Sequence, residues 1–176
     1  TSGKSTDGGG GSGKSDGGSS DARTDGSKSE GGVSSPDNIF AGAKMYVDPN
    51  TPAGKNGFKE IGDQPQALWL GAWSGNPGAT VKSALGAGTD QVHVFVAYNI
   101  PGRDCGGASS GGTESSEKYK GWINQLAEGL GGAKAAIILE PDALALNCGS
   151  DWPAMVKYSV ETLRAKPNTA VYIDAG

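Results

Sequence analysis

Residues 135–142 read AAIILEPD, an unbroken apolar run that ends in two carboxylic acids separated by a proline. Five consecutive apolar residues are typical of a strand that is covered on both faces, as in a parallel sheet. The chain contains four similar short runs, at residues 43–47, 67–73, 92–97 and 170–173. We therefore expect five strands.

Segments with helical periodicity separate most of these runs. The clearest has apolar residues at helical spacing from Tyr119 to Leu130, with Thr113 as a candidate N-cap and two glycines after it as the stop. A second helix is expected after Asp151, and a weaker one over residues 77–85. The alternation of strands and helices predicts a parallel α/β fold.

The 176-residue chain divides into two parts of unlike composition. Residues 1–35 hold 11 glycines and 10 serines and only two apolar side chains, so we expect a disordered linker. Residues 36–176 carry all four tryptophans and form the expected folding unit. An α/β barrel takes about 250 residues. The folding unit is therefore either a small open sheet or the front portion of a longer domain, and we favour the second.

Charge and composition exclude several classes of partner. The chain has 15 basic against 19 acidic side chains, which leaves no basic surplus for nucleic acid or an anionic membrane surface. No apolar run approaches the roughly 18–20 residues of a membrane span. The single histidine, His93, and two cysteines provide no metal-ligand set. We expect no metal and no cofactor.

Carboxylic acids follow three of the expected strands. Asp104 lies in the segment after residues 92–97, Glu140 and Asp142 follow residues 135–139, and Asp174 follows the last run. The carboxyl ends of parallel strands form the functional face of such folds. Converging carboxyl groups repel one another, which raises the pKa of at least one and keeps it protonated for acid catalysis. The alternative for each residue is a helix cap or a turn.

Three motifs carry a resemblance to a known family. The segments YNIPGRDCGGASSGG (98–112), ILEPDALAL (138–146) and YIDAG (172–176) closely resemble glycoside hydrolase family 6, the inverting cellulases. The resemblance covers residues 41–176 and implies a distorted, TIM-like α/β barrel that hydrolyses β-1,4-glucosidic bonds in cellulose or β-glucan. The family's domain is about twice as long. We therefore expect an N-terminal portion of the catalytic domain that is inactive or poorly folded alone.

The resemblance also implies catalytic roles. Asp142 matches the general acid that protonates the leaving oxygen, and Asp104 matches the partner that keeps this acid protonated and is discussed as a base acting through water. Tyr98 matches the tyrosine that crowds the sugar ring, and Ser110 the residue that helps hold the attacking water. Asp174 matches an aspartate at the substrate cleft. An inverting glycosidase needs roughly 6.5–9.5 Å between its two carboxyl groups.

Two further residues are expected to bind substrate. Trp69 looks like the family's sugar platform, with a place in the core as the alternative. Arg103 is the second expected substrate-binding residue, although it could instead pair with the adjacent Asp104. Glu140 is the competing candidate for the acid role of Asp142.

The two cysteines bear on the compartment. The resemblance suggests that Cys105 pairs with Cys148, with two free thiols as the alternative. A disulfide persists in oxidising compartments, which matches a secreted, extracellular enzyme acting on insoluble cellulose. The glycine- and serine-rich segment resembles the linkers that join such domains to a cellulose-binding module, which we expect upstream.

The mode of attack is less tightly constrained by the sequence. The modest loop at residues 106–117 favours an endoglucanase. The alternatives are an exo-acting cellobiohydrolase of the same family and a non-catalytic carbohydrate-binding protein.

Overall fold

The computed structural model describes residues 38–88, 90–174 and 176, so the linker expected over residues 1–35 lies outside the described residues. Four parallel strands form one sheet in the order β1-β2-β3-β4. Their bounds are Leu68–Leu70 (β1), His93–Ala97 (β2), Ala135–Leu139 (β3) and Thr169–Ile173 (β4). The predicted parallel α/β class is confirmed.

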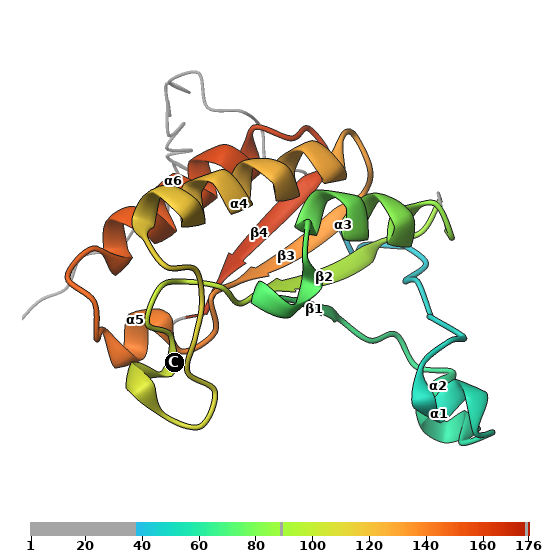
Figure 1. Ribbon diagram of the computed structural model, residues 1–176. Coiled ribbons are helices and arrows are strands. Elements are labelled where there is room, and N and C mark those ends of the chain that lie inside the picture. The colour runs from blue at the N-terminus through green and yellow to red at the C-terminus, as the bar shows by residue number, and fades with distance from the viewer. Residues whose placement is uncertain (1–37, 89, 175) are drawn as a thin grey trace, which may run out of the picture. The chain divides into compact units, whose positions relative to one another are not determined.

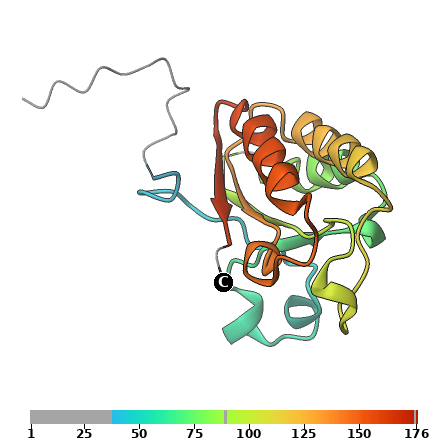
Figure 2. The same ribbon diagram turned by 90° about the vertical axis from the view of Figure 1, so that its left-hand side faces the viewer.

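Six α-helices and two 3₁₀ turns accompany the described strands. They are α1 (Pro52–Lys55), α2 (Lys59–Gly62), η1 (Ala72–Ser74), α3 (Pro77–Leu85), η2 (Asp104–Gly106), α4 (Ser116–Leu130), α5 (Ala143–Leu146) and α6 (Trp152–Arg164). The three longest, α3, α4 and α6, each connect two neighbouring strands and cover the same face of the sheet (Figure 1, Figure 2). Since the strand order never reverses, crossovers of one hand place all three connecting helices on one side, which is the winding of a barrel.

The core lies between this helical layer and the sheet. Helix α4 buries one stripe at helical spacing, which includes Tyr119, Ile123 and Leu126. These side chains belong to the same buried cluster as Phe95 of β2 and Ile137 of β3. Burying each large apolar side chain contributes about 1.5–3 kcal/mol. The apolar residues whose spacing predicts the helix are therefore also the residues that pack it against the sheet.

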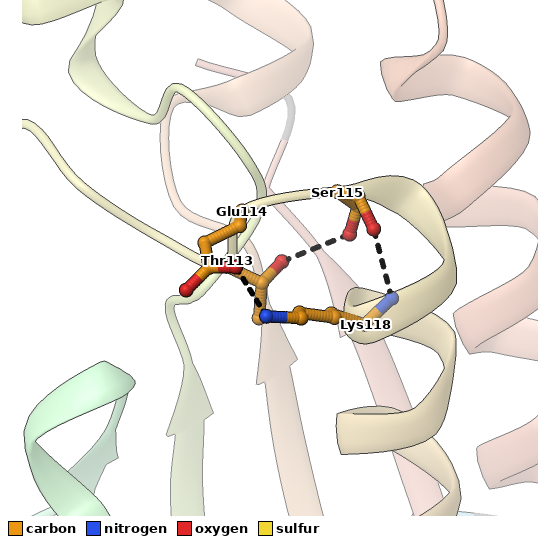
Figure 3. Close-up of polar contacts among 4 residues, drawn as sticks. All are labelled: Thr113, Glu114, Ser115 and Lys118. Atoms are coloured by element: carbon orange, nitrogen blue, oxygen red, sulfur yellow. Dashed lines mark hydrogen bonds and ion pairs between the residues drawn. The ribbon is translucent and has the colours of Figure 1, made fainter.

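The start of α4 differs from the sequence prediction. The N-cap is Ser115, not Thr113, because the Ser115 hydroxyl accepts the Lys118 backbone N–H at 3.2 Å (Figure 3). The Thr113 hydroxyl instead lies 3.3 Å from the Ser115 carbonyl. Glu114 and Lys118 form an exposed ion pair across the same turn. Thr113 lies too far before the first turn to reach its free N–H groups.

The prediction of a strand over residues 43–47 is wrong. This segment makes a single parallel bridge, Met45 to Val92. It is held by the backbone bonds of Val92 N–H to Lys44 and of Tyr46 N–H to Val92, at 2.9 and 3.0 Å. The pairing stays this short because the chain turns on both sides of it: the Ala43 N–H donates to the Phe40 carbonyl at 3.2 Å, and the Asn50 N–H donates to Oδ1 of Asp48 at 2.8 Å.

The second predicted strand is shorter than expected. Residues 67–73 form β1 only from Leu68 to Leu70, and the chain then turns through η1. The Trp73 ring folds back over Gly71 so closely that any Cβ there would overlap it. The predicted helix over residues 77–85 and the helix after Asp151 are both confirmed.

Candidate active site

The strands of the sheet end on one line. Their last residues are successive register partners: Leu70, Ala97, Leu139 and Ile173. The segments after β2, β3 and β4 therefore leave the sheet at the same edge, as Figure 1 shows for the connections to η2 and α5. The candidate site is built from two of them, residues 98–112 (the RDC loop) and residues 140–148 (the EPD loop).

The two loops concentrate unusual backbone geometry. Five non-glycine residues in them have φ between 45° and 67°: Asp104, Cys105, Glu140, Asp142 and Asn147. Side chains make this left-handed region costly, so the surrounding structure must hold each residue there. Strain of this kind clusters at functional sites.

A disulfide joins the RDC and EPD loops. Cys105 pairs with Cys148, with Cα atoms 5.6 Å apart and a sequence separation of 43. This confirms the pairing that the family resemblance implied. Closing a loop of this size restricts the unfolded chain and stabilises the fold by about 4 kcal/mol in the chain-entropy model. The bridge also ties the residue after Asp104 to the loop that carries Asp142.

Arg103 organises the inside of the RDC loop. Its side chain is only 8% exposed. Nε donates to the Ser109 carbonyl at 2.6 Å and Nη1 donates to the Tyr98 carbonyl at 2.9 Å. The guanidinium lies 4.7 Å from the Tyr98 ring and 5.0 Å from the Trp73 ring. Arg103 thus holds both ends of the loop and supports two aromatic rings.

Asp104 lies at the turn of the same loop. Its Oδ2 accepts the Ser109 backbone N–H at 2.6 Å. A Cβ at position 107 would stand 2.6 Å from this oxygen, so the close approach requires Gly107. The Asp104 carboxylate is therefore oriented by the loop backbone.

Two aromatic rings, those of Trp69 and Tyr98, contact each other at this edge of the sheet. Trp69 is 48% exposed and meets the Tyr98 ring edge-on, with centroids 5.5 Å apart. Burial raises the pKa of the Tyr98 phenol, the charges of Asp104 and Asp142 raise it further, and Arg103 opposes them. Tyr98 is therefore a neutral phenol within electrostatic reach of both predicted catalytic carboxylates.

Glu140 lies beneath the RDC loop and is 1% exposed. Its carboxylate accepts the backbone N–H groups of Asn99 and Ile100 at 3.0 and 3.1 Å and the Tyr119 hydroxyl at 2.9 Å. Burial raises the pKa of Glu140 to about 7, although the bonds from the two N–H groups oppose this shift. A substrate arriving from solvent meets Asp142, which is exposed, and not Glu140.

The remaining predicted residues are on the surface. Ser110 is exposed, in the RDC loop. Asp174 is partly exposed directly after β4, and its Oδ1 accepts the Gly176 N–H at 2.7 Å. A Cβ on Gly176 would stand 2.5 Å from that of Ala145, so this segment lies against α5 of the EPD loop.

Sequence reasoning missed two residues that support the loops. The spacing predicts Tyr119 in the apolar stripe of α4, where its ring lies, but does not show that its hydroxyl bonds to Glu140. Trp152, at the start of α6, donates its indole N–H to the Pro101 carbonyl at 2.9 Å. A buried tyrosine or tryptophan usually finds a partner for its polar atom, which is the one signal available from sequence.

The described part of the chain holds no cluster of three or more His, Cys, Asp or Glu side chains arranged for a metal ion. His93 is buried, stacks on Tyr46 with ring centroids 4.2 Å apart, and places a ring nitrogen 3.0 Å from the Gly88 carbonyl. Within the same residues, no helix has the length and apolarity to cross a membrane.

Comparison with known proteins connects this geometry to a family. The model of the family described as glycosyl hydrolases family 6 matches residues 34–176. "Endoglucanase 1" of Streptomyces halstedii is 37% identical over 155 residues, which covers 75% of this chain and 48% of the relative. "Exoglucanase A" of Cellulomonas fimi is 30% identical over 188 residues, which covers 80% of this chain and 22% of the relative.

A solved structure is similar as well. It is the endoglucanase Cel6 of Mycobacterium tuberculosis in complex with methyl-cellobiosyl-4-deoxy-4-thio-β-D-cellobioside, with 37% identity and a TM-score of 0.72 over 79% of this chain and 54% of that one. The chain thus spans about half the length of this structure and of the Streptomyces relative. The described sheet and helices share the fold of about half of that structure, and the chain belongs to glycosyl hydrolases family 6.

Proposed function

We propose that this chain is the N-terminal part of a cellulase that hydrolyses β-1,4-glucosidic bonds in cellulose or β-glucan with inversion at the anomeric carbon. The observation that carries the proposal is the meeting of the RDC and EPD loops at one sheet edge, where Tyr98 feels the charges of both Asp104 and Asp142. Family membership and relatives named as glucanases support it.

In the proposed reaction, Asp142 donates a proton to the leaving glycosidic oxygen. Asp104 helps keep that proton in place and acts on the attacking water through a second water molecule. An exposed acid on the EPD loop and a backbone-oriented carboxylate on the RDC loop, two loops joined by a disulfide, suit these roles. Inversion needs an acid on one side of the sugar and an activated water on the other.

The neighbouring residues are proposed to bind and distort the sugar. Trp69 offers a half-exposed indole face for sugar stacking. Tyr98 crowds the ring at the scissile bond, and Ser110 helps to hold the attacking water. Arg103 acts on substrate binding through the loop it holds, since its N–H groups are directed at loop carbonyls. Asp174 lines the cleft from the end of β4.

Endo attack is the preferred mode. The endoglucanases of Streptomyces halstedii and Mycobacterium tuberculosis are each 37% identical to this chain, against 30% for the exoglucanase of Cellulomonas fimi. The product spectrum tests this choice. An endoglucanase releases mixed cello-oligosaccharides and lowers the viscosity of soluble cellulose early, whereas a cellobiohydrolase releases mainly cellobiose.

A secreted, extracellular location and a cellulose-binding module upstream complete the proposal. The Cys105–Cys148 disulfide supports an oxidising compartment. Glycine and serine dominate residues 1–35, a composition suited to a flexible connection between two domains.

The function is tested with the full-length gene product and a soluble cello-oligosaccharide. Proton NMR during the first minutes of cleavage should show the α-anomer as the initial product. Initial β-anomer would reject inversion. Binding without any release of sugar would instead favour the non-catalytic carbohydrate-binding protein.

A further inference from the structure

Glu140 binds the ends of two neighbouring strands to each other. Its own backbone N–H donates to the Ala97 carbonyl, the last of β2, at 2.8 Å. Its carboxylate accepts from the next part of the RDC loop: Oε2 is 3.0 Å from the Asn99 nitrogen and 3.1 Å from the Ile100 nitrogen. Three hydrogen bonds from one residue thus fix where the RDC loop leaves the sheet relative to the EPD loop.

A second layer of hydroxyl groups supports this carboxylate from the helices. The Tyr119 oxygen lies 2.9 Å from Oε1 of Glu140, and the Ser159 Oγ lies 3.1 Å from the Tyr119 oxygen. Ser159 also lies 2.9 Å from the Met155 carbonyl. Helices α4 and α6 therefore hold Oε1 of Glu140 from below through side-chain oxygens. Oε2 holds the loop above, and Oε1 also lies 3.1 Å from the Asn99 nitrogen.

This network is complete whether or not Glu140 carries a proton. When Glu140 is ionised, the Tyr119 hydroxyl donates to Oε1. When it is protonated, it donates to Tyr119, which donates to Ser159, which donates to the Met155 carbonyl. In both states Oε2 still accepts the two loop N–H groups. The position of the RDC loop therefore depends on the length of the Glu140 side chain and not on its charge.

We propose that Glu140 is a positioning residue of the active site, which sets the RDC loop, with Tyr98 and Asp104, at its working distance from Asp142. The proposal rests on the function proposed above. Tyr98 immediately precedes the two anchored N–H groups, and Arg103 carries the restraint onward through its bond to the Tyr98 carbonyl. A misplacement of about 1 Å in such a constellation costs on the order of 10²-fold in rate.

Two substitutions separate the effect of side-chain length at position 140 from the effect of its charge. Glu140→Gln keeps the length: its oxygen can accept both loop N–H groups while its NH₂ donates to Tyr119. Glu140→Asp keeps the charge and acidity but is shorter by one methylene, so it cannot stay within hydrogen-bond distance of the loop and of Tyr119 together. Both variants are measured in the full-length gene product with a soluble cello-oligosaccharide.

We expect Glu140→Gln to retain kcat within about threefold of the unsubstituted enzyme and Glu140→Asp to lose about 30- to 100-fold in kcat. The KM should change less than kcat in both, since Trp69, the proposed sugar platform, lies on β1 and outside the RDC loop. A kcat for Glu140→Gln as low as that of Glu140→Asp, or lower, would overturn the proposal and make Glu140 a candidate acid.

A structural control and a second readout keep the test decisive. Leu163→Ala removes a fully buried side chain of α6 and should lower stability without lowering kcat of the folded enzyme.

Amide hydrogen exchange at Asn99 and Ile100 should stay slow in Glu140→Gln and become at least tenfold faster in Glu140→Asp. Equal exchange in the two variants contradicts the anchoring even if Glu140→Asp is too unstable to assay. Slow exchange in an enzyme that cleaves no glucan would refute the proposed function and leave the anchoring intact.

Discussion

The helical layer and the loop edge of the same sheet are built in different ways. Helices α4 and α6 have ordinary backbone geometry and bury apolar stripes against the strands. The RDC and EPD loops, at the carboxyl ends of those strands, hold five non-glycine residues at positive φ, a disulfide and a buried carboxylate. The helical layer is stabilised by buried apolar area, and the loops are stabilised by a disulfide and specific hydrogen bonds.

This difference indicates where function lies. An apolar stripe tolerates many substitutions of similar volume, because the hydrophobic free energy is proportional to the apolar area buried and does not depend on direction. A loop whose residues are strained must be restrained bond by bond, and the restraints serve to aim particular side chains. We therefore expect similar substitutions in the helical layer and in the loops to change the free energy of unfolding by different amounts, or in opposite directions.

Removal of the disulfide should have the largest effect on stability. The double variant Cys105→Ser, Cys148→Ser should lose about 4 kcal/mol in the free energy of unfolding, because the unfolded chain regains the entropy of a closed loop of more than 40 residues. Urea unfolding measures the loss. The reduced, alkylated protein should match the variant, and an unchanged midpoint in both would show that the bridge does not restrain the loops.

A pair of glycine substitutions compares the two regions directly. Gly112 in the RDC loop has φ +94°, and a Cβ there would overlap the Ile100 carbonyl, so Gly112→Ala should cost at least about 2 kcal/mol. Gly121 lies on the exposed face of α4 with open space around it, and Gly121→Ala should stabilise by about 0.5–1 kcal/mol. Thermal unfolding of both variants tests the contrast, which fails if the two shifts have the same sign.

Glu140 should make stability depend on pH. The pKa of this carboxyl is about 7 in the folded protein against an ordinary value of 4.5, so the folded state binds the proton more tightly. The resulting stability is fully present below pH 4.5 and is lost as pH rises through 7, by about 3 kcal/mol in total. Glu140→Gln does not titrate and should therefore be the more stable form at pH 8. Parallel pH curves for the two proteins in urea unfolding would contradict this.

A small loss of stability is expected at the cap of α4. Ser115→Ala should cost about 1 kcal/mol, because the Lys118 N–H loses its acceptor at the start of the helix. Thr113→Ala should cost less, since the Thr113 hydroxyl makes only long contacts of 3.3 and 3.4 Å. A reversed order in chemical denaturation would restore Thr113 as the functional cap.

The helical layer could be predicted well from the sequence. The strand over residues 135–139 and the helix over residues 77–85 were predicted with the observed bounds, because apolar periodicity reports local burial directly. The strand expected over residues 43–47 is reduced to one bridge, to Val92, because turns bound it on both sides. Apolar character alone does not show how many residues of a segment find a pairing partner.

The loop edge could be predicted only in part. The motifs placed Asp104 and Asp142 at strand ends, and the family resemblance supplied the disulfide. The anchoring of the RDC loop by Glu140 and the bond from Trp152 to Pro101 join residues 40 to 51 positions apart. Such contacts depend on how the loops fold over the sheet, so neither periodicity nor spacing could predict them.

The central claim is that the loop edge performs acid-catalysed glycoside hydrolysis through Asp142. Asp142→Asn tests it most directly, because asparagine has the same shape and tolerates the left-handed backbone at φ 67° but cannot donate an acidic proton. With a soluble cello-oligosaccharide and the full-length gene product, kcat should fall at least about 10³-fold while the dissociation constant measured by calorimetry changes less than about threefold. Hydrolysis at the unsubstituted rate would contradict the account.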